Sequence, residues 1–223
     1  MPVLLSYLAV LVAGYCAGLL APVAVRKYFS PGIEPRAKRQ LSAAATAMLF
    51  LLASQPSPEP QFGWGNIALA ALASVTIPLA FIDVRVQRLP NPLTLGLAVV
   101  ALIADLLLLT QISDAGFGAT LLIAALVPSG FTLLLSLLSP GALGMGDVKL
   151  ALAIGLVLAP WGLGTVVAAF SLGCLFAGAI GVVLLLTKRA DLKTYLPFGP
   201  FLLLGAWLGV LTMDVLLSNG FGA

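Results

Sequence analysis

The sequence predicts an all-α integral membrane protein, a polytopic bundle of about eight transmembrane helices with both termini on the non-cytoplasmic side. Three observations lead to this fold class. First, 61% of the residues are hydrophobic and only 9% are charged, with a mean hydropathy of +1.14, whereas soluble domains are about 45–50% apolar and about 25% charged. Second, the chain contains a series of apolar stretches, most of them long enough to cross a bilayer as a helix. Third, the basic residues lie in alternate loops between these stretches.

The apolar stretches predict one membrane-embedded domain over residues 1–223. Residues 3–25 have no basic residue before them and Arg26-Lys27 after them, the reverse of the charge order of a signal peptide, so they count as a span. A basic loop and a Pro-rich turn enclose the second stretch, and Pro78 predicts a kink in the third. The expected spans are approximately 3–25, 41–53, 66–82, 93–110, 117–138, 148–159, 163–187 and 200–217.

The loop charges predict the orientation. The loops at 26–40, 83–92, 139–149 and 188–196 hold all eleven Lys and Arg, and the intervening loops hold none. Basic residues accumulate on the cytoplasmic side of a membrane. These four loops are therefore expected in the cytoplasm, and both termini outside.

Two aspartates stand at the cytoplasmic ends of expected spans. Asp147 follows two glycines and precedes the apolar run 150–160, and Asp83 lies between the apolar run 67–82 and the polar stretch 85–92. An acid at a membrane boundary is a functional-site candidate by default. Two carboxylates brought within a few Å share one proton. One can then take a proton from water while the other donates to a substrate carbonyl oxygen, which is peptide hydrolysis without a covalent intermediate.

The helix ends suggest a role for each acid. Asp147 is expected to cap the helix that begins at Val148, where the helix dipole favours an anion. Asp83 ends a helix, where the dipole disfavours an anion, although Arg85 and Arg88 oppose this effect. We therefore hypothesise that Asp147 is the base and Asp83 the acid, within a pair that titrates as a unit.

Three blocks of sequence carry a resemblance to a known family. Residues 144–150, G-M-G-D-V-K-L, resemble the G-x-G-D-x-K-L signature of the A24-type prepilin peptidases, which are bacterial intramembrane aspartyl proteases. Residues 83–94 are similar to the family's other aspartate loop, and residues 197–201, P-F-G-P-F, resemble its late block. The resemblance implies the catalytic pair Asp83 and Asp147, with supporting or substrate-binding residues Arg88, Pro90, Asn91, Gly144, Gly146, Lys149, Pro197, Phe198, Gly199 and Pro200.

The resemblance also implies a reaction and a location. Such enzymes cut the short basic leader from type IV prepilins, pseudopilins or similar precursors at the cytoplasmic membrane of bacteria, while the apolar part of the precursor stays in the bilayer. Gly144 and Gly146 have no Cβ, so they permit positive φ angles, and we hypothesise that they allow a substrate backbone to approach closely. The turn from Pro197 to Pro200 is a second candidate for open backbone near the site.

The chain departs from the longer family members. Those place a cytoplasmic domain with two zinc-binding cysteine pairs after the first span and methylate the new pilin N-terminus, whereas the interval 26–40 has no cysteine. The chain has no His, and Cys16 and Cys174 lie singly in apolar runs. We therefore expect a short form with no cofactor and no metal, and methyltransferase activity is not supported. A net charge of +3 spread over short loops gives no reason to expect nucleic acid as a partner.

Two other classes of protein remain compatible with the sequence. A small transporter or channel can use intramembrane carboxylates and glycine-broken helices, but it tends to place charge at mid-bilayer. A Ser–Lys protease would need a nucleophile near Lys149, and Ser136 and Ser139 form no recognisable arrangement with it. Asp105 and Asp214 are expected at the outer interface rather than in catalysis, and Gly173, Gly178 and Gly181 in close helix contacts.

Overall fold

The computed structural model describes residues 11–19, 36–54, 63–112, 116–138, 143–189 and 196–218, and nearly all of these residues are helical. A helix covers residues 11–19. The rest of the expected span 3–25 and the loop 26–35 lie outside the described residues. The helices that follow are α2 Arg36–Ala53, α3 Gly63–Val86, α4 Asn91–Leu109, α5 Phe117–Leu138, α6 Met145–Leu158, α7 Gly162–Leu186 and α8 Gly199–Ser218, with a 3₁₀ turn η3 at Ala159–Trp161 between α6 and α7.

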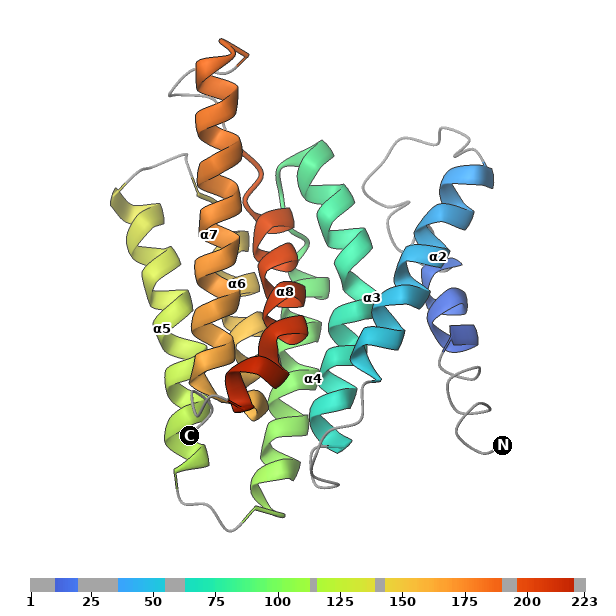
Figure 1. Cartoon of the computed structure of the whole chain (residues 1–223), viewed down its shortest axis with the longest axis vertical. Helices are drawn as coiled ribbons and strands as arrows, with labels where there is room; N and C mark the ends of the chain where they lie inside the picture. Colours follow the sequence, from blue (N-terminus) through green and yellow to red (C-terminus); the bar gives the residue numbers. More distant parts are fainter. Residues whose placement is uncertain are drawn as a thin grey trace.

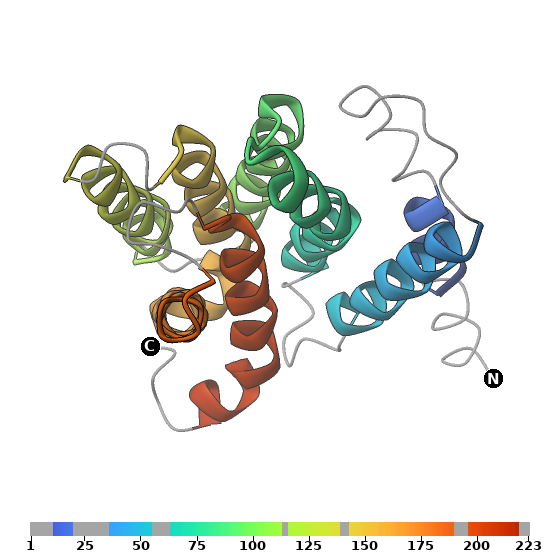
Figure 2. The same cartoon turned by 90° about the horizontal axis from the view of Figure 1, so that it is seen from above.

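The helices form two layers (Figures 1 and 2). One layer runs in the order α5, α6, α4, α3 and α2, and each helix packs against the next. The second layer consists of α7 and α8, which pack extensively on each other, while α8 also contacts α3 and α6. The ends of α3 and α7 and the starts of α2, α4, α6 and α8 lie toward the upper end in Figure 1.

The predicted helix positions are close to those observed. Residues 117–138 match α5, and the limits of the other later spans differ from the helices by up to four residues. The largest difference is in α2, which begins at Arg36 rather than at residue 41, because the basic segment continues the helix. By length and composition, four stretches of the described chain could cross a membrane: Trp64–Val86, Asn91–Leu109, Phe117–Leu138 and Met145–Leu186, the last of which η3 divides into α6 and α7.

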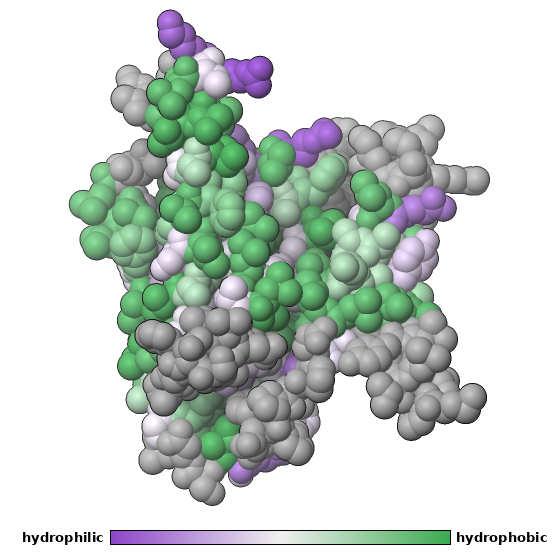
Figure 3. Space-filling view, in the orientation of Figure 1, coloured by the Kyte–Doolittle hydropathy of each residue, from purple (hydrophilic) through white to green (hydrophobic). Residues whose placement is uncertain are grey.

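The outer surface is apolar in the way a bilayer requires. Large apolar side chains of α4, α5 and α7 are exposed, among them Ile103, Leu126 and Leu175. The face drawn in Figure 3 is largely hydrophobic, with hydrophilic residues at the upper end of α7. The inside of the bundle holds Leu72, Leu150 and Leu202, which are almost completely buried. The described part of the chain is thus a helical bundle that is apolar both inside and on its flanks.

Glycines allow the closest helix contacts. A Cβ added at Gly155 would overlap the carbonyl oxygen of Ala124 on α5, and a Cβ at Gly205 would overlap that of Ala169 on α7. Gly173 faces the backbone of Phe201 across the same α7–α8 contact, as expected for small residues between membrane helices. The same expectation is wrong for Gly178 and Gly181, where no atom of the described residues lies within 4 Å of an added Cβ.

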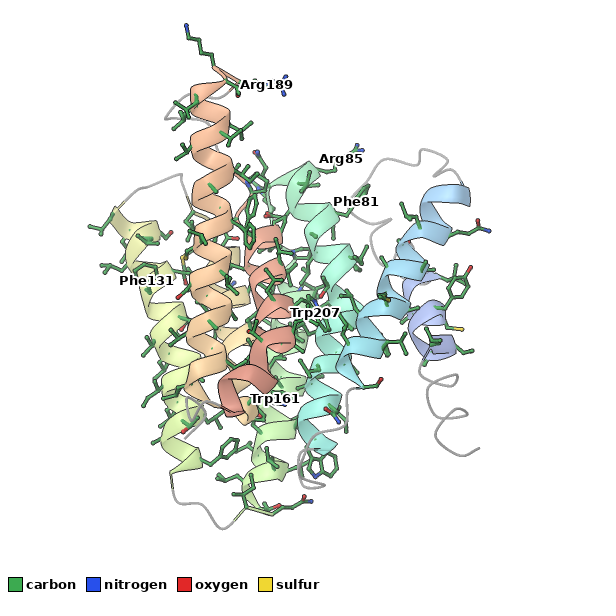
Figure 4. The ribbon with its side chains drawn as sticks, viewed as in Figure 1. Phe81, Arg85, Phe131, Trp161, Arg189 and Trp207 are labelled. Atoms are coloured by element: carbon green, nitrogen blue, oxygen red, sulfur yellow. The ribbon has the colours of Figure 1, made fainter. Side chains whose placement is uncertain are left out.

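Two hydrogen bonds fix α8 against α3. The indole Nε1–H of Trp207 donates to Thr76 Oγ1 at 3.0 Å (Figure 4). About two turns away along both helices, the N–H of Gly199 donates to Asp83 Oδ2 at 3.0 Å. The two helices therefore run antiparallel in a defined register, and the start of α8 is placed beside the end of α3.

The close contact at Gly155 predicts a difference between two Gly→Ala substitutions. Gly155→Ala must push α5 and α6 apart, so we expect it to destabilise the fold by about 1–3 kcal/mol. Gly96→Ala on α4 meets nothing within 4 Å and should be neutral or slightly stabilising, because alanine loses less conformational entropy in a helix than glycine. Thermal unfolding of the purified protein in detergent measures both, and equal midpoints for the two variants would contradict the packing described.

Candidate active site

Asp83 lies in the last turn of α3 and is 1% exposed. Its Oδ2 accepts the N–H of Gly199, the first residue of α8. The first N–H groups of a helix have no partner within that helix, and proline is well suited to its first turn, so the sequence Gly199-Pro200 both begins α8 and leaves one amide free for Asp83. A Cβ at Gly199 would lie 2.8 Å from Asp83 Oδ2, so only glycine fits this contact without a shift.

Asp147 is the third residue of α6 and is also 1% exposed. Its Oδ2 accepts the N–H of Gly144 at 3.0 Å, so the carboxylate reaches back to the residue that caps the helix. The expectation that Asp147 itself caps a helix starting at Val148 is wrong, because α6 begins at Met145. Among the described residues, Asp147 Oδ1 is buried and has no hydrogen-bond partner.

The two aspartates line one open pocket with a volume of about 210 Å³. They come from segments far apart in the sequence, and they are close enough to interact electrostatically. Of the predicted supporting residues, Arg88, Gly144 and Gly146 line the same pocket. The remaining lining residues are Gln87, Leu89 and Met145.

These last three residues were not expected to contribute to the site. Gln87 and Leu89 stand on either side of Arg88 in the segment that connects α3 and α4, so the motif block at 83–94 contained a signal for them. Met145 occupies the variable position of the G-x-G-D motif, where no residue type is required. The left-handed φ of Gln87, 53°, turns the chain at the end of α3 and brings this segment over the pocket.

Other predicted residues do not line the pocket but lie at the starts of the neighbouring helices. Lys149 Nζ donates to Asn91 Oδ1 at 2.9 Å and joins the start of α6 to the start of α4. Pro90 caps α4 with a φ of −66°. Pro197 and Phe198 precede α8; Phe198 belongs to the apolar core, and its carbonyl oxygen accepts the N–H groups of Phe201 and Leu202.

The structure does not use the freedom of the two motif glycines to adopt a positive φ. Gly144 has a φ of −87° and Gly146 lies in the first turn of α6, so neither adopts a positive φ. A Cβ at Gly146 would lie 2.8 Å from Leu89 Cβ. Glycine is required there by the packing of Leu89 rather than by a left-handed backbone.

Asp105 was expected at the membrane interface, and the structure buries it instead. It lies near the C-terminal end of α4 and is completely buried rather than at a surface, and neither of its carboxylate oxygens has a partner among the described residues. It does not line the pocket. The side chain of Asp214 lies outside the described part. Within that part, no three acidic or cysteine side chains form a group that could hold a metal ion.

Basic side chains surround the pocket end of the bundle. Arg85 is exposed, and its guanidinium lies over the Phe81 ring, 5.3 Å from the centroid (Figure 4). Lys188 and Arg189 follow the end of α7 at this same end of the molecule. The pocket itself is lined by two buried acids and one basic residue, Arg88. A pair of buried carboxyl groups is an arrangement that can activate a water molecule against a carbonyl group.

Comparison with known proteins identifies the family. The model of the type IV leader peptidase family matches residues 70–186, more than half of the chain and a stretch that includes both aspartates. The prepilin leader peptidase/N-methyltransferase of Aeromonas hydrophila is 32% identical over 209 residues, 90% of this chain and 63% of that protein.

Two further relatives cover less of the chain. The protein of the same name from Pseudomonas aeruginosa is 32% identical over 69% of this chain and 52% of its own length. A type 4 prepilin-like proteins leader peptide-processing enzyme of Escherichia coli is 35% identical over 72% of this chain and 56% of its own length. The chain thus spans between about half and 63% of these curated relatives. No solved structure matches the chain. With a family model that covers both pocket aspartates and relatives that extend along most of the sequence, the chain belongs to the type IV leader peptidase family.

Proposed function

We propose that this protein is an intramembrane aspartyl endopeptidase that removes the short basic leader from type IV prepilins or pilin-like precursors at the cytoplasmic face of the bacterial membrane. The observation that carries the proposal is the meeting of Asp83 and Asp147 in one pocket, each 1% exposed and each held by one backbone amide. The names of the relatives support the substrate class.

The chemistry follows from two carboxyl groups that share one proton. The ionised carboxylate takes a proton from water as the water oxygen attacks the carbonyl carbon of the scissile peptide, and the protonated carboxyl gives its proton to the carbonyl oxygen. Collapse of the tetrahedral intermediate breaks the C–N bond, and the leaving amine takes up the proton that the ionised carboxylate took from water.

The individual roles of the two acids remain a hypothesis, with Asp147 as base and Asp83 as acid. The helix-dipole argument behind it is incomplete, because Asp83 also accepts an amide at a helix start, that of α8. Both carboxylates therefore experience the positive end of a helix dipole. The proposal that they act as a pair does not depend on which one holds the proton.

We further propose about eight spans, with the pocket on the cytoplasmic side and both termini outside. Support comes from the basic residues Arg85, Arg88, Lys188 and Arg189 at the pocket end of the bundle. A leader held in the cytoplasm by its positive charges would meet the pocket there, while the apolar part of the precursor remains in the bilayer. The transporter alternative is less favoured, since both pocket acids lie at one end of the bundle rather than at its middle.

The first prediction from the proposed function concerns the catalytic pair. Asp83→Asn and Asp147→Asn should each lower cleavage of a pilin-like precursor by at least about 10²-fold, because each removes one of the two proton-transfer groups. Asp105→Asn is the matched control, since this acid is as deeply buried but lies outside the pocket, and it should keep cleavage within about twofold. Gel-based cleavage by purified proteins in detergent provides the measurement. Normal cleavage by either pocket variant would refute the proposal.

The second prediction concerns the amide that Asp83 accepts. Gly199→Ala places a Cβ 2.8 Å from Asp83 Oδ2 and must displace the carboxylate, so kcat should fall by about 10- to 100-fold. Gly178→Ala on α7, where an added Cβ meets nothing, should leave kcat unchanged. Steady-state kinetics of both variants test this, and an unchanged kcat in Gly199→Ala would show that the contact does not matter.

The third prediction concerns orientation. In a Cys16→Ser/Cys174→Ser background, the thiol of Arg88→Cys should react with a membrane-impermeant maleimide in inside-out vesicles only. The thiol of Gln111→Cys, beyond the other end of α4, should react in right-side-out vesicles only. Labelling of both thiols from the same side would contradict the proposed topology.

A further inference from the structure

Leu89 lies against two glycines, Gly146 and Gly199, each of which is linked to one of the two aspartates. It lies in the segment that connects α3 and α4, and its backbone is held on both sides. The N–H of Gln87 donates to the Asp83 carbonyl oxygen at 2.9 Å, and the Pro90 carbonyl oxygen accepts the N–H groups of Leu93 and Thr94. Leu89 is therefore fixed to the end of one helix and to the start of the next.

The side chain of Leu89 points inward and contacts two other helix starts. A Cβ at Gly146 would lie 2.8 Å from Leu89 Cβ and 3.5 Å from Leu89 Cδ1. A Cβ at Gly199 would lie 3.4 Å from Leu89 Cδ1. Leu89 thus packs against the backbones of α6 and α8 at two glycines, which have no side chain. Only 9% of Leu89 is exposed.

Each of these two glycines is tied to one aspartate. Gly146 directly precedes Asp147, and the N–H of Gly199 binds Asp83 Oδ2. A side chain that stands between the two backbones therefore determines how far apart the two carboxylates are held. Protein interiors are close-packed and transmit such displacements rather than absorbing them.

We propose that Leu89 is a positioning residue that sets the separation of Asp83 and Asp147. This inference rests on the proposed peptidase function for its kinetic consequence, but its geometric content stands without it. If Leu89 were only one more apolar side chain of the core, its truncation would lower stability and leave the geometry of the pair unchanged. Leu97 on α4 is 2% exposed and outside the pocket, so Leu97→Ala is a matched control for that role.

Crosslinking tests the geometry without any need for catalysis. In a Cys16→Ser/Cys174→Ser background, Asp83→Cys/Asp147→Cys provides two thiols, and bifunctional thiol reagents of graded length report their separation. We expect Leu89→Ala to change the shortest reagent that joins them and Leu97→Ala to leave it unchanged. The same reagent pattern in both variants would overturn the proposal, whatever the protein's activity.

Steady-state kinetics test the consequence of this positioning for peptide cleavage. With a purified pilin-like precursor, Leu89→Ala should lower kcat by about 10-fold or more and change KM by less than about twofold, since a misplaced pair affects the transition state and not the bound substrate. Leu89→Met conserves volume and should recover most of the lost kcat, and Leu97→Ala should lower the unfolding temperature while keeping kcat.

The outcomes separate this inference from the proposed function. A fall in kcat for Leu97→Ala as large as that for Leu89→Ala, or no recovery in Leu89→Met, would overturn the role of Leu89. If the unmodified protein failed to cut any pilin-like precursor, the proposed function would fall. The crosslinking result would still decide whether Leu89 sets the separation of the two acids.

Discussion

The hydrogen bond from Gly199 N–H to Asp83 Oδ2 is the interaction on which the geometry of the candidate site depends. It joins the last turn of α3 to the first residue of α8, and it satisfies at once a buried carboxylate and a helix amide that has no partner in its own helix. Asp147 is held in a similar way by the amide of Gly144 at the start of α6. In an apolar environment both groups would otherwise be costly to bury. One amide at each of two helix starts thus binds one oxygen of each acid, while Asp147 Oδ1 has no partner among the described residues.

The sequence predicted the helices well because membrane helices leave a simple pattern. Every backbone polar group must be bonded within a span, so long apolar stretches separated by charged loops mark the helices directly, and residues 117–138 match α5. The two acids were also predicted, since each stands at an edge between apolar and polar sequence. That they share a pocket followed from the orientation inferred from the basic loops.

Other features depend on contacts between distant segments and leave no local pattern. Gly146 is glycine because Leu89 packs on it, whereas the sequence suggested backbone freedom. Gly178 and Gly181 resemble Gly173 in sequence, yet of these three only Gly173 has a close neighbour on α8. Asp105 is completely buried, although its place near the end of a span suggested an interface. Nothing in the local sequence distinguishes Leu89 from the other leucines of the chain. Its packing against Gly146 and Gly199 does.

The pairing of Trp207 with Thr76 and of Gly199 with Asp83 has a consequence for how α8 can move. A helix that slides by one residue along its neighbour shifts by about 1.5 Å and must rotate by about 100° to keep the same contacts. Two anchors about two turns apart on the same pair of helices would both be broken by such a slip. Intermediate positions of α8 are then unfavourable, so the two hydrogen bonds favour a single register of α8 on α3, the register in which the first amide of α8 meets the Asp83 carboxylate.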